Sequence, residues 1–304
     1  MLIYLPIAEM TVAVEEIFLL GFFVGFVSGV FGVGGGFLTT PLLIFMGIPP
    51  AVAVGTQASQ LVASGTSGVI GYWQKGYVDF YIGTIMLVGG IAGSVFGIII
   101  FQLMQYLGQI DLVISLLYII LLGGVGGMML FESLFSLSKA KKRSMKSEFN
   151  RFKSPSMISK LPYKIRFPRS KLYISAFVPG GIGFVSGFLV STMGVGGGFL
   201  LIPAMIYILG MPAYLVAGTS LFQIVFTSAF ATIMHAITNQ SVDILLALFL
   251  IIGGVIGARF GVIASKRVNG ARARVVLALI VLAVCTKVAM SLFLEPGQIF
   301  VIEI

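Results

Sequence analysis

Two glycine-rich strings carry the strongest chemical signal in the sequence. Gly-Val-Gly-Gly-Gly occurs at 32–36 and again at 194–198, and an apolar segment follows each string. Consecutive glycines weaken a helix and let a ligand approach the main chain. The free N–H groups and the dipole at the start of the following helix favour an anion. We therefore predict an anion site built from main-chain N–H groups of Gly34, Gly35, Gly36, Gly196, Gly197 and Gly198. The alternative is that these glycines only allow helices to pack closely.

A polar motif follows each glycine string. It reads Gly-Thr-Gln-Ala-Ser-Gln at 55–60 and Gly-Thr-Ser-Leu-Phe-Gln at 218–223. The Thr and the last Gln of each motif are four residues apart, so they share one face of a helix. These side chains either line a substrate route or form hydrogen bonds between helices, which typically contribute about 0.6 kcal/mol each. The residues assigned to the route are Thr56, Gln57, Gln60, Thr219, Ser220 and Gln223.

Four titratable or charged residues stand at notable places in the apolar segments. Arg259 either pairs with an anion near the inner mouth of the protein or extends its side chain to the membrane interface. His235, the one histidine, either relays protons or is a polar residue near the outer interface. Asp79 and Asp243 precede matching segments, where a carboxylate caps the N-terminus of a helix.

The composition identifies the environment in which these motifs must work. Hydrophobic residues make up 58% of the 304 residues and charged residues 10%, against about 25% charged residues in a soluble domain. Asp, Glu, Lys and Arg are absent from 17–74 and from 172–242. A spanning helix needs about 20 apolar residues, and a transmembrane barrel would show alternating segments instead. We predict an all-α, polytopic membrane protein.

The chain contains an internal repeat. The second glycine string lies 162 residues after the first, and the match continues to Asp79 and Asp243, where the offset is 164. We predict two homologous halves, 1–135 and 172–304, joined by a basic loop at 136–171. Each half has a glycine-rich helix break or hairpin followed by three long transmembrane helices. The long segments are expected at about 50–73, 78–104 and 111–135, and at about 212–237, 242–264 and 273–294.

The distribution of Lys and Arg predicts the orientation. Segment 136–171 holds 12 of the 19 Lys and Arg residues, with Glu148 as its one acid, and such loops stay in the cytoplasm. If the segments around each glycine string form a hairpin, each half crosses the membrane an odd number of times. The halves are then inverted, as in many secondary transporters, and both termini are extracytoplasmic. If one short segment did not return, the halves would be parallel. Whether the hairpins cross the membrane or are re-entrant is left open.

Several function classes are excluded by what the sequence lacks. Neither a GxSxG nor an HExxH motif is present, and one His and one Cys, Cys285, are too few for a metal cluster. We therefore predict no enzyme activity, no metal and no cofactor. The basic residues indicate orientation or contact with anionic lipid head groups, not nucleic-acid binding.

The duplicated motifs resemble the TauE/SafE family of sulfite exporter-like membrane proteins. The resemblance rests on 32–60 and 194–223, and on GGIAGSVFG at 89–97 and GGVIGARFG at 253–261. It implies transport across the cell membrane of a small anion: sulfite, a sulfonate such as sulfoacetate, or a related organic anion. The family motif falls on Gly34 to Gly36, Pro41, Gly55 and Thr56, and on Gly196 to Gly198, Pro203, Gly218 and Thr219.

We expect a secondary transporter or exporter that alternates access between its two halves. The alternatives are an anion channel, which would have a continuous polar path, and a non-transporting membrane-embedded subunit. The expected partners are the small anion, membrane lipids and a coupling ion, proton or sodium, to which no residue is assigned. The halves differ at Thr39-Thr40 versus Leu201-Ile202 and at Gln57 versus Ser220. The exact substrate, the direction of transport and the oligomeric state stay open.

Overall fold

The protein is mostly helical, with one short β-hairpin before α1 and another before α6. A computed structural model describes residues 2–31, 36–139, 162–265 and 270–294. In chain order the elements are β1 (Leu2–Leu5), β2 (Met10–Ala13), α1 (Val14–Phe31), α2 (Gly36–Phe45), α3 (Pro50–Gln74), α4 (Phe80–Tyr106), α5 (Ile110–Lys139), β3 (Lys164–Phe167), β4 (Leu172–Ser175), α6 (Phe177–Met193), α7 (Gly198–Tyr207), α8 (Ala213–Met234), a π-helical turn (His235–Asn239), α9 (Ile244–Ser265) and α10 (Gly270–Leu294).

The prediction of a polytopic helical membrane protein is confirmed. Each of the six predicted long segments coincides with a helix. Among the described residues, four helices are long and apolar enough to cross a membrane: Phe80–Tyr106, Tyr214–Asn239, Ile244–Gly261 and Val275–Leu292. Helix α3 is also long, but it carries the first polar motif, whose Thr56, Gln57 and Gln60 side chains are buried inside the protein.

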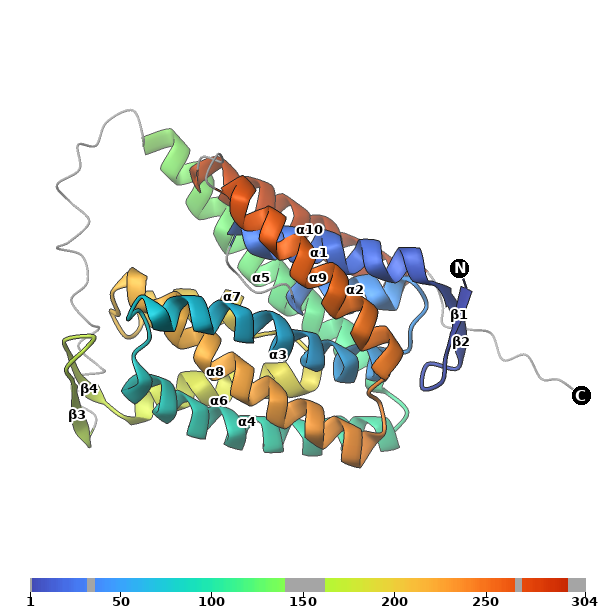
Figure 1. Cartoon of the computed structure of the whole chain (residues 1–304), viewed down its shortest axis with the longest axis horizontal. Coiled ribbons are helices and arrows are strands. Elements are labelled where there is room, and N and C mark those ends of the chain that lie inside the picture. Colours follow the sequence, from blue (N-terminus) through green and yellow to red (C-terminus); the bar gives the residue numbers. More distant parts are fainter. Residues whose placement is uncertain (1, 32–35, 140–161, 266–269, 295–304) are drawn as a thin grey trace, which may run out of the picture.

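Helices from the two halves pack against one another. Helix α1 runs along α9, α4 runs along α6, and the pairs α3–α8 and α5–α10 also lie side by side (Figure 1). Glycines allow these close contacts, because a Cβ atom at Gly25 would lie 2.2 Å from the Gly254 carbonyl oxygen. At Gly187 it would lie 1.9 Å from the Gly90 carbonyl oxygen. In each of these contacts a glycine of one half lies against the main chain of the other half, so these glycines serve close helix packing.

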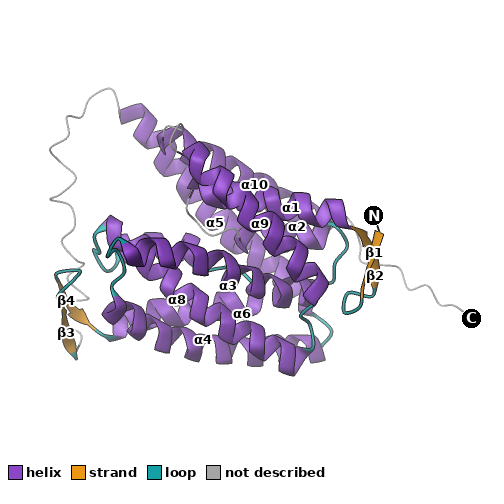
Figure 2. Cartoon of the chain, viewed as in Figure 1, coloured by secondary structure: helices purple, strands orange, loops and turns teal. Residues whose placement is uncertain are grey.

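The two β-hairpins were not predicted. Strands β1 and β2 pair antiparallel before α1, and β3 and β4 do so before α6. The hairpins lie at opposite ends of the helical bundle, as Figure 2 shows. Their strands have four residues each, too few to distinguish from the start of an apolar helix by periodicity. Residues 10–13 and 172–175 therefore form strands just before α1 and α6, and β3 lies within the expected 136–171 loop.

The hairpins are packed into the protein interior at both ends. Leu5 and Val12 of the first hairpin join a buried apolar cluster with residues of α2, α3 and α9. Phe167 and Ile174 of the second join a matching cluster with residues of α4, α7 and α8. Each hairpin therefore contacts both halves of the chain.

Candidate functional site

The second glycine string interrupts the helices as predicted. Helix α6 ends at Met193, and Gly194 follows in the left-handed conformation with φ of +68°. Helix α7 begins at Gly198, and 194–198 is buried throughout. Within the described ranges, the N–H groups of Gly196 and Gly197 have no hydrogen-bond acceptor. A buried main-chain N–H without a partner is rare, so this break has the donors that an anion requires.

The first glycine string separates α1 from α2. Helix α1 ends at Phe31 and α2 begins at Gly36. The predicted site residues Gly34 and Gly35 lie outside the described residues. Gly36 is buried at the first position of α2. Of the three glycines predicted to bind an anion in the first half, it is therefore the one that the structure describes.

Gly36, at the start of α2, meets the second break inside the protein, and this contact forms the junction between the two halves. A Cβ atom at Gly36 would lie 2.8 Å from the main-chain nitrogen of Gly196 and 3.1 Å from the carbonyl oxygen of Gly194. A Cβ atom at Gly197 would lie 2.5 Å from Ser186 Oγ. The glycines thus let main-chain groups of both halves approach each other, and a side chain at Gly36 or Gly197 would fill the junction.

One face of α3 covers this junction. Main-chain atoms of Val54 and the side chain of Leu61 approach the Cβ positions of Gly194 and Gly196, at 3.0 Å and 2.4 Å. With about 100° of rotation per residue, Gln57 lies on the same face between them. Its side chain is 1% exposed, and its Oε1 atom has no hydrogen-bond partner in the described structure. Of the predicted route residues, Gln57 is the one with an unsatisfied polar atom on this face.

The two threonines of the polar motifs bind main-chain groups of the opposite half. The Asp243 nitrogen donates to Thr56 Oγ1 at 3.0 Å. The Asp79 nitrogen donates to Thr219 Oγ1 at 2.9 Å. Each Asp also caps its own helix, because Oδ1 accepts from the nitrogens two and three residues later. The predicted caps are confirmed, and the threonines form the interhelical bonds that were the alternative to a substrate route.

The remaining route residues also have hydrogen bonds to the protein. Gln60 Nε2 donates to the Leu250 carbonyl oxygen at 3.2 Å, although its Oε1 is buried without a partner. Gln223 Nε2 donates to Thr227 Oγ1, and Gln223 Oε1 accepts from Ser186 Oγ. Ser220 Oγ donates to the Ala217 carbonyl oxygen one turn earlier. Their part in binding an anion remains a prediction.

The two accessory residues lie in different environments. Arg259 is exposed on α9, so it does not join the buried junction. His235 is completely buried and not at the surface. Its Nε2 lies 2.8 Å from the Ser191 carbonyl oxygen and its Nδ1 lies 2.8 Å from Asn239 Nδ2. The carbonyl oxygen requires a proton on Nε2, and the amide nitrogen requires an acceptor at Nδ1. This pattern corresponds to the neutral ring.

Tyr118 is a residue of the site that the sequence analysis missed. Its hydroxyl donates to the Met193 carbonyl oxygen at 2.5 Å, at the last residue of α6. The final carbonyls of a helix have no partner within it, so Tyr118 and His235 together cap α6 beside the second break. A lone Tyr in the apolar stretch of α5 was the available signal, but the sequence does not say that it reaches α6.

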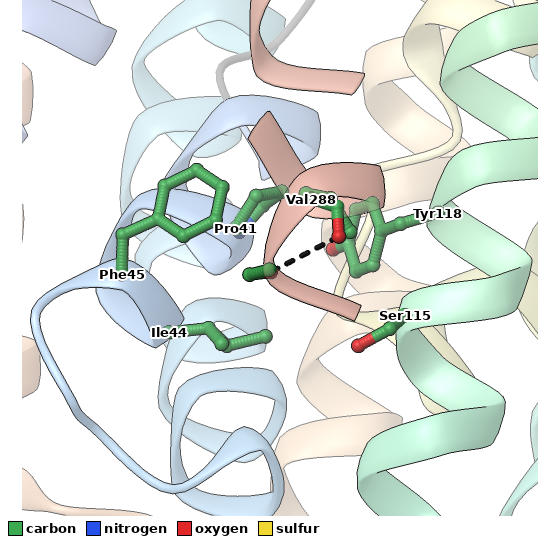
Figure 3. A pocket seen from close by; sticks show the side chains of 7 residues that line it. Pro41, Ile44, Phe45, Ser115, Tyr118 and Val288 are labelled. Carbon is green, nitrogen blue, oxygen red and sulfur yellow. Dashed lines mark hydrogen bonds between the residues drawn. The ribbon is translucent and has the colours of Figure 1, made fainter. Parts of the chain in front are cut away.

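A small pocket adjoins Tyr118. Figure 3 shows its lining between α2, α5 and α10, and Ser291 donates to the Val288 carbonyl oxygen there. Lys287 lies at this place too, with Nζ 4.5 Å from the ring centroid of Phe45. The pocket therefore combines apolar walls, hydroxyl groups and a nearby cation. Its lining residues are Pro41, Ile44, Phe45, Ser115, Tyr118, Val288 and Ser291.

The fold defines a polytopic helical membrane protein whose two halves meet where Gly36 lies against the buried break at 194–198. The sequence pattern of the family described as "Sulfite exporter TauE/SafE" matches residues 17–288, so the chain belongs to this family. It is a family of membrane transporters and not of enzymes, which confirms both the resemblance and the prediction of a non-enzymatic membrane protein.

Proteins with similar sequences are also named as probable membrane transporters. The chain is 27% identical to "Probable membrane transporter protein YunE" of Bacillus subtilis, over 82% of this chain and 88% of the relative. It is 29% identical to "Probable membrane transporter protein YjnA" of the same organism, over 88% and 96%. A "Probable membrane transporter protein" of Xylella fastidiosa is 28% identical over 87% and 90%. No solved structure matches the chain.

Proposed function

We propose that the protein is a secondary transporter that moves a small oxyanion across the cell membrane by alternating access. Sulfite, a sulfonate such as sulfoacetate, or a related organic anion is the expected substrate class. The meeting of Gly36 with Gly194 and Gly196 is the observation that carries the proposal. It brings unpaired main-chain N–H groups to a buried point where two helices start, an arrangement that favours an anion.

The amide of Gln57 supplies the side-chain contact in this proposal. Rotating a Gln amide by half a turn exchanges its oxygen and nitrogen, so its unpartnered end can present N–H groups to an oxyanion. The site then holds a negative charge by oriented dipoles. The family description, which names sulfite exporters, supports the same substrate class.

We further infer that the halves are inverted repeats. Three observations support this: the hairpins lie at opposite ends of the bundle (Figure 1), α1–α9 packing is matched by α4–α6 packing, and the Thr56–Asp243 bond is matched by Thr219–Asp79. Gly25 packs against Gly254, and Gly187 packs against Gly90, so Gly25 and Gly187 are equivalent positions. The offset of 162 therefore also holds between α1 and α6. The identical strings at 25–29 and 183–187 differ from this register by four residues, which is about one helical turn.

In this orientation, the β1–β2 end faces outward and the 136–171 loop lies in the cytoplasm. The pocket of Figure 3 then lies toward the outer side, because it involves the end of α2, the first turns of α5 and the last turns of α10. It provides an outer approach to the junction, with Tyr118 between the pocket and the end of α6 and Lys287 to attract an anion.

Flux in proteoliposomes tests the function. Purified protein should take up radiolabelled sulfite or sulfoacetate with saturation, and an imposed pH gradient tests proton coupling. Gly35→Leu and Gly197→Leu should each abolish uptake while the protein still inserts. Gly181→Leu is the matched control, because a Cβ atom at Gly181 meets nothing within 4 Å. Unsaturable flux would favour the channel, and absence of flux the non-transporting subunit. Flux retained in both Leu variants would refute the proposed role of the breaks.

A further inference from the structure

The two hairpins have the same structure but different exposed residues. With an offset of 162, Leu5 corresponds to Phe167 and Val12 to Ile174, and all four are buried. The turns match as well, since Glu9 and Lys171 occupy equivalent positions with φ of 53° and 54°. Because the buried residues and the turns correspond, a difference between the exposed residues of the two hairpins does not result from a different fold.

The exposed positions carry opposite chemistry. Leu2, Tyr4, Ile7 and Glu9 of the first hairpin correspond to Lys164, Arg166, Arg169 and Lys171 of the second, and all eight are exposed. Three apolar or aromatic side chains and one acid are therefore replaced by four cations, while the buried partners stay apolar. The interior packing is the same in both hairpins, so it does not require cations in the second one. We therefore attribute the four cations to the surroundings of the second hairpin.

Aromatic side chains accompany these cations. Tyr163 is 76% exposed and Tyr173 is 62% exposed, and Tyr173 is the cross-strand partner of Arg166. Exposed Tyr beside Lys and Arg is typical of the membrane interface. In the described part of the chain, the side chains of Lys164, Arg166 and Lys171 have no ion-pair or hydrogen-bond partner, and all three are exposed. These three cations are therefore available to an anionic group.

The second hairpin is also connected to the junction between the halves. Ser170 Oγ donates to Asp79 Oδ2, and Arg169 Nη1 donates to the Val78 carbonyl oxygen at 2.9 Å. The Asp79 nitrogen in turn binds Thr219 of the other half. An anion bound to the second hairpin would therefore stabilise the start of α4 and its contact with α8.

We propose that Lys164, Arg166 and Lys171, with Tyr163 and Tyr173, form a docking surface for anionic phospholipid head groups. The phosphate of a lipid such as phosphatidylglycerol accepts hydrogen bonds from the Arg guanidinium in a bidentate manner, and the Tyr rings lie at head-group depth. The bilayer is the source of this phosphate because the hairpin lies at the end of the spanning helices. This inference does not depend on which solute is transported.

The test measures how lipid changes stability of the full-length protein. Thermal unfolding is followed in nanodiscs of dioleoylphosphatidylcholine, alone or mixed equally with dioleoylphosphatidylglycerol. The mixed bilayer should raise the unfolding temperature of the native protein. The triple variant Lys164→Gln, Arg166→Gln, Lys171→Gln should lose most of that rise. The control Lys75→Gln, Arg259→Gln, Lys287→Gln removes the same types of charge at other exposed positions and should keep it.

Further arms identify the source of the phosphate. Glycerol phosphate or inorganic phosphate added to phosphatidylcholine nanodiscs should give no rise, and a rise equal to that of the lipid would overturn docking to the bilayer. Added NaCl should reduce the lipid effect, because salt screens exposed charges. The salt dependence is measured on the native protein alone, so it tests the proposal even if the triple variant does not fold. An equal rise in both triple variants, or no dependence on salt, would refute the proposal.

Discussion

The main-chain nitrogen of Asp243 donates a hydrogen bond to the Thr56 hydroxyl at 3.0 Å, across 187 residues of sequence. This bond ties the first residue before α9 to the first turns of α3. Asp243 Oδ2 also accepts from the nitrogen of Ile7 in the first hairpin, at 3.1 Å. The Asp243 carboxylate therefore connects the first hairpin to the start of α9, and the main-chain nitrogen of the same residue connects to α3. At the other end, the Asp79 carboxylate accepts from Ser170 and the Asp79 nitrogen donates to Thr219.

Thr56→Val should destabilise the protein by about 1 kcal/mol, because the buried Asp243 nitrogen loses its acceptor while the side-chain volume stays the same. Thr219→Val should have a similar effect through Asp79. Thr56→Ser keeps the hydroxyl and serves as the control. Thermal unfolding in one fixed detergent or lipid measures the difference. A Thr56→Val protein as stable as Thr56→Ser would show that the bond contributes nothing.

Gln57→Leu should weaken anion binding without weakening the fold. The Gln57 Oε1 atom is already unpaired, so an apolar side chain of similar length costs no hydrogen bond within the protein. Loss of a direct contact to an anion should raise the KM of uptake about tenfold, which corresponds to about 1.4 kcal/mol. Ser59→Ala on the same helix is the control. An unchanged KM together with lower stability would assign Gln57 to packing instead.

Local signals explain what the sequence predicted well. Apolar runs, glycine strings and an Asp before a helix act within a few residues, so the helices, the break at 194–198 and the caps at Asp79 and Asp243 are all found in the structure. Glycines also lie at the close contacts between helices, because small side chains let transmembrane helices approach one another.

Long-range pairing explains what was missed. Whether Thr56 lines a route or binds Asp243 depends on a partner 187 residues away. The contact between Tyr118 and Met193, 75 residues apart, is equally invisible in the local pattern. The offset of 162 between the glycine strings agrees with the helix contacts, which make Gly25 equivalent to Gly187.

Lys287→Gln should weaken capture of the anion from the outer side only. Lys287 is exposed, and its Nζ lies over the ring of Phe45, which lines the pocket. Loss of one exposed charge contact should raise the outer KM roughly threefold. Right-side-out and inside-out vesicles separate the two faces, and the effect should shrink at high salt. Arg259→Gln removes another exposed cation as a control. Equal changes in KM from both sides would argue against an outer approach through this pocket.

His235 should act as a cap of α6 and not as a proton carrier, because both of its ring nitrogens are engaged with Ser191 and Asn239. His235→Leu leaves the Ser191 carbonyl oxygen without this donor and should cost about 1–3 kcal/mol of stability. His235→Gln retains an N–H donor and should be milder. The ratio of flux with and without an imposed pH gradient should be the same in His235→Gln and the native protein. A ratio that falls to one only in the variant would instead assign proton coupling to His235.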